Sequence, residues 1–439
     1  MPKGHGCPGF GFAAPKDCPT SHDWNPRFGL AWTPFSSMPW VIRSGYGIYY
    51  VFPDTNLTNN TKNVVPLQEP QSVFNARPVP TLTFGNFFVG QSFGAANPNP
   101  GQPCPFGMVL LSCQTPSVTS ELVHLKQQYV QEWNLSVQDQ IAKAVSITVA
   151  YVGNRTVHLQ QAIPNNLPDP GPGTIQLRRP YPQWGPIGLH KWEGTANYNA
   201  FQAQIETREW RNLTVLASYA KSKCLDNGSD ESGPPAPQLA SLMYGPCNFD
   251  IPEAASVSYD YALPFGEGHR FLSGKSAIVN GALGDWRLSG IVTLQAGLPF
   301  TPTISSDVAN TGAGSQRPEL VGKPHVTGNI ACWFYVSANS SCSSVSTQAA
   351  FAVPAKYTYG DSGRNILRSG SLSEWDAGLV KNFKIRENEY LVFRAEYFNV
   401  LNHPTFGAPG TNIDVASGGQ VLKTLNSNRI GQFALKLFF

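Results

Sequence analysis

The eight cysteines are the residues of this sequence whose spacing most directly predicts chemistry. Taken as sequence neighbours they form four pairs: Cys7 with Cys18, Cys104 with Cys113, Cys224 with Cys247, and Cys332 with Cys342. Paired cysteines persist in oxidising compartments such as the periplasm or the cell surface. We therefore predict loop disulfides, with eight unrelated free thiols as the alternative, because connectivity does not follow from sequence alone. No Cys-x-x-Cys or His-x-x-x-His spacing supports a zinc site.

No constellation of residues predicts catalysis. The sequence has no His-Glu-x-x-His motif, no phosphate-binding loop and no Gly-x-Ser-x-Gly nucleophile elbow. Asp226, Asp230 and Glu231 offer oxygen ligands of the kind that calcium prefers, but the Ser-Gly-Pro-Pro segment that follows favours a solvated loop. The sequence thus predicts a protein that is not an enzyme and that has no cofactor and no metal.

A set of polar residues occurs at alternate positions of extended segments. These residues are Arg43, Gln138, Gln202, Gln204, Glu206, Arg208, Arg394 and Glu396. Side chains of both signs on one strand face suit the watery lumen of a membrane barrel, because Arg or Lys on the lipid face would cost about 2–4 kcal/mol at mid-depth. We predict that they face the lumen, where they either contact a plug or only hydrate the interior. Arg394 and Glu396 share a face and are expected to pair with each other or with a plug.

The elements that must position these residues are strands. Segments in which apolar and polar residues alternate with a period of two predict half-buried strands. About eleven such segments occur: Arg27–Phe35, Val41–Tyr50, Tyr129–Ile141, Val145–Asn154, Tyr198–Glu209, Leu213–Ser222, Ala255–Leu263, Trp286–Gly297, Ser373–Phe383, Glu389–Asn399 and Arg429–Phe439.

The connections between these strands alternate between short and long. In an antiparallel meander successive connections lie at opposite ends of the sheet. Nearly all short turns therefore fall at one end, and the long connections, such as Arg155–Asn197, at the other. Outer-membrane barrels show this asymmetry, with short periplasmic turns and long extracellular loops. The expected fold is all-β: an antiparallel transmembrane β-barrel meander.

The terminal segment has one wholly apolar face. Phe433, Leu435, Leu437 and Phe439 alternate with Gln432, Ala434, Lys436 and Phe438. By itself this pattern fits the last strand of a soluble sandwich as well as a lipid-facing barrel strand, and the sorting of the loops favours the barrel. Aromatic residues near strand ends fit the girdles of such a barrel: Tyr46, Tyr49, Tyr50, Trp133, Tyr151, Trp286 and Trp375.

Composition narrows the function classes. The chain has 439 residues with 13% charged, and its net charge of +3 comes without a Lys/Arg cluster, which argues against nucleic-acid binding. No apolar run approaches the roughly 20 residues of a transmembrane helix. Barrel strands leave no such run, since each spans only about 9–11 residues and half of these are polar. The first residues, MPKGHGCPGFGF, contain no apolar core of a secretory signal.

The direction of the last strand gives an expectation about the whole protein. This strand ends on the short-turn side, which we take as periplasmic, so with an odd number of strands the first begins on the extracellular side. Single-chain bacterial barrels have even strand numbers. We therefore expect residues 1–439 to be one barrel portion, an open half of a larger barrel, lacking an odd number of upstream strands and a signal peptide. The free edge of the last strand is then an aggregation liability.

Several sequence strings, spread over nearly the whole chain, carry a resemblance to a known family. They are NPRFGLAWTPF to VIRSGYGIYY (25–50), QQYVQEWNLSVQDQI to ITVAYVGNRTVHL (127–159), YNAFQAQIETR to LTVLASYAKSKCLDN (198–227), YALPFGEGHRFL (261–272), GDWRLSGIVTLQAGLPFTP (284–302), GDSGRNILRSGSLSEWDAGLVKNFKIRE (360–387), LVFRAEYFNVLNHPTFGAPG (391–410) and the final FALKLFF. With these strings the chain resembles the TonB-dependent outer-membrane receptors of the Oar-like, acidobacterial type.

The resemblance implies a fold, a location and partners. The fold would be a barrel of about 22 strands filled by an N-terminal plug, and this chain would be its C-terminal barrel portion, without plug and N-terminal domains. The location would be the outer membrane of a Gram-negative bacterium. The TonB complex would act through the N-terminal part, and the long loops would bind a small-molecule, oligosaccharide or peptide ligand for energised uptake. Phe439, with Phe433, Leu435 and Leu437, resembles the terminal signal that the barrel-assembly machinery recognises.

Two other functions stay open from the sequence. Within the membrane, the alternative is a passive porin or a surface adhesin. From another class, a secreted β-rich carbohydrate-binding protein would explain the aromatic content of 12%. That protein would be soluble without detergent, whereas a barrel would fractionate with the outer membrane.

Overall fold

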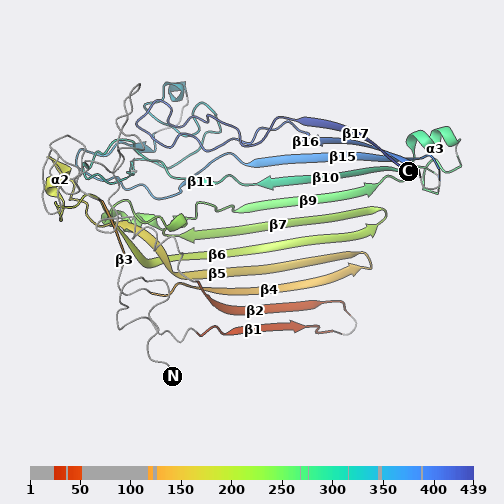
Figure 1. Cartoon of the computed structure of the whole chain (residues 1–439), viewed down its shortest axis with the longest axis horizontal. Coiled ribbons are helices and arrows are strands. Elements are labelled where there is room, and N and C mark those ends of the chain that lie inside the picture. Colours follow the sequence, from red (N-terminus) through yellow and green to blue (C-terminus); the bar gives the residue numbers. More distant parts are fainter. Residues whose placement is uncertain are drawn as a thin grey trace, which may run out of the picture.

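One large sheet dominates the molecule. The computed structural model describes residues 24–35, 38–51, 117–121, 126–266, 268–274, 276–314, 316–344, 349–386 and 389–439. Eleven strands of the sheet follow one path, in which each strand pairs with the next of these along the chain, and Figure 1 shows them side by side. All pairs along the path are antiparallel. Among the described residues, β1 and β17 form the two edges.

Each segment with a period of two overlaps one strand of this path. The strands are β1 (Arg27–Trp32), β2 (Val41–Tyr50), β4 (Tyr129–Ala142), β5 (Val145–Pro164), β6 (Ile187–Trp210), β7 (Leu213–Asp226), β9 (Glu253–Ala262), β10 (Trp286–Gln295), β15 (Leu372–Lys384), β16 (Tyr390–Phe398) and β17 (Ile430–Phe438). The described sheet is open, and its strands fit the all-β antiparallel architecture expected from the sequence.

The predicted end of β5 and the predicted start of β6 were wrong. The sequence placed a loop at Arg155–Asn197, but the two strands stay paired to Pro164 and Gly188. The pairing register shifts on both sides of Leu159, and His158 has a positive φ of 60°. Such a bulge breaks the period of two, which is why the pattern ended ten residues before the strand does.

The connections are sorted by length with one exception, because connection 263–285 at the short-turn end is about as long as connection 165–186 at the other end. At one end of the sheet lie the short turns 33–40, 143–144, 211–212 and 385–389, together with the connection 263–285, which contains the helix α3 (Ala277–Leu283). At the other end lie the connections 165–186, 227–252, 296–371 and 399–429, and most of the connection between β2 and β4 lies outside the described residues. Figure 1 shows the chain ending at the short-turn end, next to α3.

Short elements that the sequence analysis did not predict occur in the long connections. They are β3 (Val118–Glu121), which runs parallel to β6, β8 (Gly245–Pro246), which pairs with β7, the ribbons β11 (Pro299–Phe300) with β14 (Leu367–Arg368) and β12 (Glu319–Leu320) with β13 (Phe351–Ala352), the helix α2 (Ile175–Arg178), and the 3₁₀ helices Ser229–Glu231, Pro237–Met243 and Ser340–Ser344. Elements of two to seven residues are too short to show a period.

The hydrophobic core lies among the long connections. Its buried members come from the connections 296–371 and 399–429 and include Phe300, Ile304, Trp333, Phe334, Val336, Phe351, Leu367 and Ile413. The rings of Phe300 and Phe334 lie 5.6 Å apart, and Phe334 meets Phe351 edge to face at 6.0 Å. The long connections are thus packed against one another. We call connections 165–186, 227–252, 296–371 and 399–429 the loop cap.

Candidate functional site

The register of the sheet brings all the predicted lumen residues to one face. Residues directly opposite each other on paired strands point to the same side of the sheet. Gln138 faces Thr148, Thr148 faces Gln204, and Gln204 faces Ser218. The same pairing can be followed from strand to strand across the sheet. It defines one surface, which we call the polar face. This face holds Arg43, Gln138, Gln202, Gln204, Glu206, Arg208, Arg394 and Glu396.

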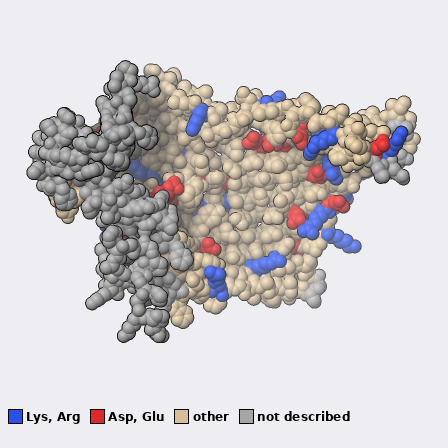
Figure 2. Space-filling model, in the orientation of Figure 1, with Lys and Arg blue, Asp and Glu red and all other residues tan. Residues whose placement is uncertain are grey.

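Other polar residues on this face were not among the predicted lumen residues. They are Asn134, Ser136, Ser218, Ser256, Ser258, Asp260, Arg287, Ser289, Thr293, Glu374, Asp376, Gln432 and Lys436. The same alternation identifies them once the strand register is known. The polar face therefore crosses the sheet from β2 to β17 (Figure 2 shows acidic and basic side chains interspersed).

Several of the opposite charges on the polar face form ion pairs. Ion pairs join Arg208 to Glu206 at 2.9 Å, Arg287 to Asp260 at 3.0 Å and Arg394 to Glu396 at 3.4 Å. The Arg43 guanidinium donates a hydrogen bond to Gln138 Oε1 at 2.9 Å. These groups are largely exposed, so each pair contributes little to stability, typically about 0–1 kcal/mol. They make the surface hydrophilic without giving it a large net charge.

Two cavities indent the polar face. The larger, about 430 Å³, is lined by residues of β7, β9, β10, β15 and β16 and includes the carboxylates of Asp260, Asp376 and Glu396. The smaller, about 280 Å³, shares Asp260 with the first and adds the cations of Arg287, Arg394 and Lys436. The polar face is thus hollowed where acidic and basic groups adjoin, an arrangement able to receive polar groups of either sign.

The opposite face of the sheet is mostly apolar, with charged side chains such as Lys221 and Lys381. Leu135 faces Tyr151, which faces Phe201 on β6. This surface, called the apolar face, includes Leu135, Val149, Tyr151, Phe201, Ile205, Tyr219, Leu294, Phe433, Leu435 and Leu437. Phe433 and Leu435 each expose 65% of their surface. Water-soluble proteins rarely leave an apolar patch of this extent uncovered.

Six of the seven residues predicted for an aromatic girdle lie on the apolar face, and their depth in the membrane stays a prediction. Tyr46, Tyr50, Trp133, Tyr151, Trp286 and Trp375 lie on the apolar face. Tyr49 lies on the polar face instead, with the Arg27 guanidinium 4.5 Å from its ring centre. Because Tyr49 is one position from Tyr50, the alternation of the strand sends its side chain to the other side.

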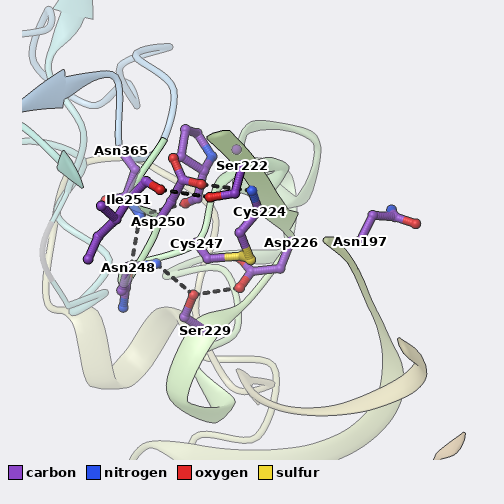
Figure 3. Close-up of a disulfide and its surroundings, with 12 residues drawn as sticks. Asn197, Ser222, Cys224, Asp226, Ser229, Cys247, Asn248, Asp250, Ile251 and Asn365 are labelled. Carbon is purple, nitrogen blue, oxygen red and sulfur yellow. Dashed lines mark hydrogen bonds between the residues drawn. A yellow bond between two sulfur atoms is a disulfide. The ribbon is translucent and has the colours of Figure 1, made fainter. Parts of the chain in front are cut away.

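Two connections of the loop cap are held in place by a buried charged pair and by a disulfide, and Figure 3 shows the disulfide. Cys224 at the end of β7 is bonded to Cys247, with Cα atoms 5.4 Å apart. Next to it the Arg364 guanidinium contacts the Asp226 carboxylate, and their side chains are only 6% and 2% exposed. Arg364 also donates to Met243 O at 3.0 Å and to Asn248 Oδ1 at 3.2 Å. Connections 227–252 and 296–371 are thereby fixed to each other.

A second disulfide lies inside the hydrophobic core. Cys332 and Cys342 are bonded and fully buried. Both disulfides are among the four predicted pairs. The other two predicted pairs, Cys7 with Cys18 and Cys104 with Cys113, lie outside the described residues.

Arg317 of the loop cap is buried without a carboxylate partner among the described residues. Arg317 is 5% exposed, its Nη1 atom has no hydrogen-bond partner, and its Nη2 atom donates to Met243 Sδ at 3.5 Å. Burial lowers the pKa of Arg317 to about 10, because a dry environment disfavours the charged form. The group therefore stays protonated at neutral pH.

Asp226 and Asp230, which were considered as calcium ligands, accept hydrogen bonds from protein side chains instead. Asp226 contacts Arg364 and accepts from Ser229 Oγ at 2.5 Å, and Asp230 accepts from Asn248 Nδ2 at 3.2 Å. Within the part of the chain that the structure describes, no three His, Cys, Asp or Glu side chains gather closely enough to hold a metal ion.

The helices give a separate observation. Among the described residues, no helix has the length and apolar character needed to cross a membrane.

Comparison with known families identifies the fold. The model of a family described as an outer membrane beta barrel domain matches residues 17–432, nearly the whole chain. The chain belongs to this family of outer-membrane β-barrel domains. Its location is the cell outer membrane, and its family is one of membrane barrels rather than enzymes. No curated protein sequence matches the chain significantly.

Solved outer-membrane transporters resemble this barrel domain in part. The transporter YddB from Escherichia coli has 15% sequence identity and a TM-score of 0.49, with 94% of this chain and 40% of that chain covered. The FrpB iron transporter from Neisseria meningitidis has 9% identity and a TM-score of 0.41, with 94% and 38% covered. The siderophore receptor PiuA from Acinetobacter baumannii has 9% identity and a TM-score of 0.42, with 94% and 35% covered. The barrel domain thus spans about 40% or less of these chains.

Proposed function

We propose that this barrel domain is the C-terminal barrel portion of a TonB-dependent outer-membrane receptor of the Oar-like type. The observation that carries the proposal is the separation of the two sheet faces across all of the strands from β2 to β17. A polar face with paired charges suits a wet lumen or contact with a plug, and an exposed apolar face suits lipid. The family match supports the same orientation of the sheet in the membrane.

The direction of the edge strands supports the half-barrel part of this proposal. The path has eleven antiparallel strands, so β1 and β17 run in the same direction. An antiparallel barrel closes between these edges only through an odd number of further strands. A barrel of about 22 strands meets this condition. In the intact receptor, upstream strands would cover both edges, and an upstream plug would occupy the polar face and its cavities.

The loop cap is the proposed ligand-binding region. Its connections lie at the end of the sheet opposite the short turns, which is the extracellular end of an outer-membrane barrel. The buried pair and the disulfides hold the cap in one arrangement, which lowers the entropy lost on binding. The ligand class is a small molecule, an oligosaccharide or a peptide, and uptake would be energised by the TonB complex through the N-terminal part.

Fractionation of cells that express the chain with its native upstream sequence tests the proposal. We expect the protein in the outer-membrane fraction, with gel mobility that changes on heating because a folded barrel resists detergent. An upstream frame that encodes a plug would distinguish the receptor from a passive porin or a surface adhesin. A soluble, monomeric product would contradict the proposal and would favour a secreted carbohydrate-binding protein.

A further inference from the structure

The helix α3 is fastened to the apolar face at the short-turn end of the sheet. The indole nitrogen of Trp286 donates to Ala282 O at 3.1 Å, and Lys381 Nζ donates to Gly284 O. Trp286 and Lys381 face each other directly across β10 and β15, and Lys381 faces Phe393 on β16. All three side chains belong to the apolar face. The end of α3 therefore lies on the outer side of the sheet, away from the polar face.

The connection that carries α3 is held in place by its backbone. Asp285 N donates to Phe265 O at 3.3 Å, and the rings of Phe265 and Phe271 lie 5.8 Å apart. Gly266 has a φ of 118°, and a Cβ atom there would meet Gly284 Cα at 2.9 Å. Only glycine combines this backbone conformation with this close approach. The position of α3 relative to the sheet is thus fixed by packing of the main chain.

The helix presents apolar side chains outward. Its sequence, AIVNGAL, contains no charged residue. At 3.6 residues per turn, Ile278, Ala282, Val279 and Leu283 fall on one arc of the helix. Ile278 is 84% exposed and Leu283 is 52% exposed. The described part of the chain does not cover this arc.

The residues below α3 indicate its depth in the membrane. Tryptophan is enriched at the boundary between headgroups and acyl chains, where its ring is apolar and its N–H is hydrogen-bonded. Trp286 meets this description, with its ring edge to face against Phe393 at 6.2 Å and its N–H bonded to α3. Lys381 is 1% exposed, and its ammonium lies 5.3 Å from the Trp286 ring centre and 5.0 Å from that of Phe383. A cation on a lipid-facing surface is tolerated at this boundary.

We propose that α3 is an interfacial anchor, whose apolar arc enters the phospholipid leaflet at the periplasmic rim of the barrel. The arc continues the apolar face, so the lipid that covers that face is the occupant that also covers Ile278 and Leu283. A short, uncharged apolar helix lying at a rim adds apolar area to the membrane contact without spanning the bilayer. The inference rests on the proposed lipid-facing orientation of the apolar face.

Depth-dependent fluorescence quenching tests this anchor. A fluorescent amino acid would replace Ile278, Leu435 or Leu422 in three separate variants of the full chain, reconstituted in phosphatidylethanolamine–phosphatidylglycerol vesicles. Leu435 lies on the apolar face, and Leu422 is a 73% exposed residue of the loop cap. Lipids brominated on the acyl chain quench from the bilayer, and iodide quenches from water. We expect brominated lipid to quench the probe at position 278 to the extent seen at 435, and iodide to quench only at 422.

Comparison of the three probe positions distinguishes an error in the α3 anchor from an error in the orientation of the sheet. If position 435 is quenched by lipid but position 278 is quenched by iodide as strongly as 422, the anchor is wrong and the lipid-facing sheet stands. If position 435 is itself open to iodide, the orientation of the sheet is wrong. The probe at position 278 can also be measured in membranes isolated from cells. If neither quencher reaches it there, but iodide reaches it in vesicles, then a periplasmic protein covers α3. That result would also overturn the lipid anchor.

Discussion

At the scale of single residues, the loop cap contains a charged pair almost wholly removed from solvent. Arg364 contacts Asp226, and the matching exposed pair on the polar face is Arg208 with Glu206. Removing one member of a buried pair leaves an uncompensated charge and typically costs about 3–5 kcal/mol. We predict that Arg364→Met lowers the free energy of opening of connection 227–252 by this amount, measured by amide hydrogen exchange in detergent.

The control for that prediction is Arg208→Met. The Arg208 side chain is 82% exposed, so its loss is expected to change stability by less than about 1 kcal/mol. Equal effects of the two substitutions on hydrogen exchange would show that the Arg364 pair does not hold the loop cap.

Asp414 gives a prediction about pH. Burial acts to raise the pKa of Asp414, but hydrogen bonds from the amides and hydroxyls of Ser305 and Ser306, at 2.8–3.0 Å, hold it below the ordinary value. A lowered pKa means that the stabilising effect is complete above the unfolded pKa of about 3.9 and is lost as the pH falls below it. Asp414→Asn should therefore increase hydrogen exchange of residues 296–310 at pH 6, and this difference should shrink below pH about 4. A difference that is independent of pH would contradict the assignment.

The sequence predicted which face of the sheet each strand residue occupies, but it did not predict the partners of loop residues. Gln202, Gln204 and Glu206 share a face because a strand alternates strictly, and no structure was needed to see it. Asp226, in contrast, was weighed only as a calcium ligand. Its partner Arg364 lies 138 positions further along the chain, and no local pattern relates residues of two irregular loops.

At the scale of elements, the end of β17 carries a prediction about assembly. Phe439 is 97% exposed and directly follows β17, whose apolar face holds Phe433, Leu435 and Leu437. If the terminal aromatic residue is the signal for the barrel-assembly machinery, Phe439→Asp should reduce the amount of protein in the outer membrane of cells. Folding into pure lipid vesicles should be unchanged, because no machinery is present there. A parallel loss in both measurements would indicate a defect of folding rather than of recognition.

Strand interiors followed from the sequence, but strand ends and short helices did not. The bulges around Leu159 interrupt the period of two, so β5 and β6 extend further than predicted. The helix α3 has seven residues, including Gly281, and its position depends on Trp286, Lys381 and the close approach of Gly266 to Gly284. These contacts form only when β9, β10 and β15 are side by side.

At the scale of the whole molecule, the order of the sheet was predictable because strands joined by short turns become neighbours. The loop cap was not predictable, since its core joins residues from connections 296–371 and 399–429 that share no periodicity. For the molecule as a whole, we propose that one face of the sheet contacts lipid and the other faces a polar lumen.

A paired lysine scan of β17 and β6 tests this claim most directly. Phe433 and Ile205 lie on the apolar face, away from Lys381 and Lys221, and their neighbours Ala434 and Gln204 lie on the polar face. We predict that Phe433→Lys and Ile205→Lys lower the free energy of unfolding from lipid vesicles by about 2–4 kcal/mol each, because a lysine in the bilayer interior must be desolvated. Ala434→Lys and Gln204→Lys should change it by less than about 1 kcal/mol. Equal costs on the two faces, or larger costs at Ala434 and Gln204, would contradict the lipid-facing orientation of the apolar face.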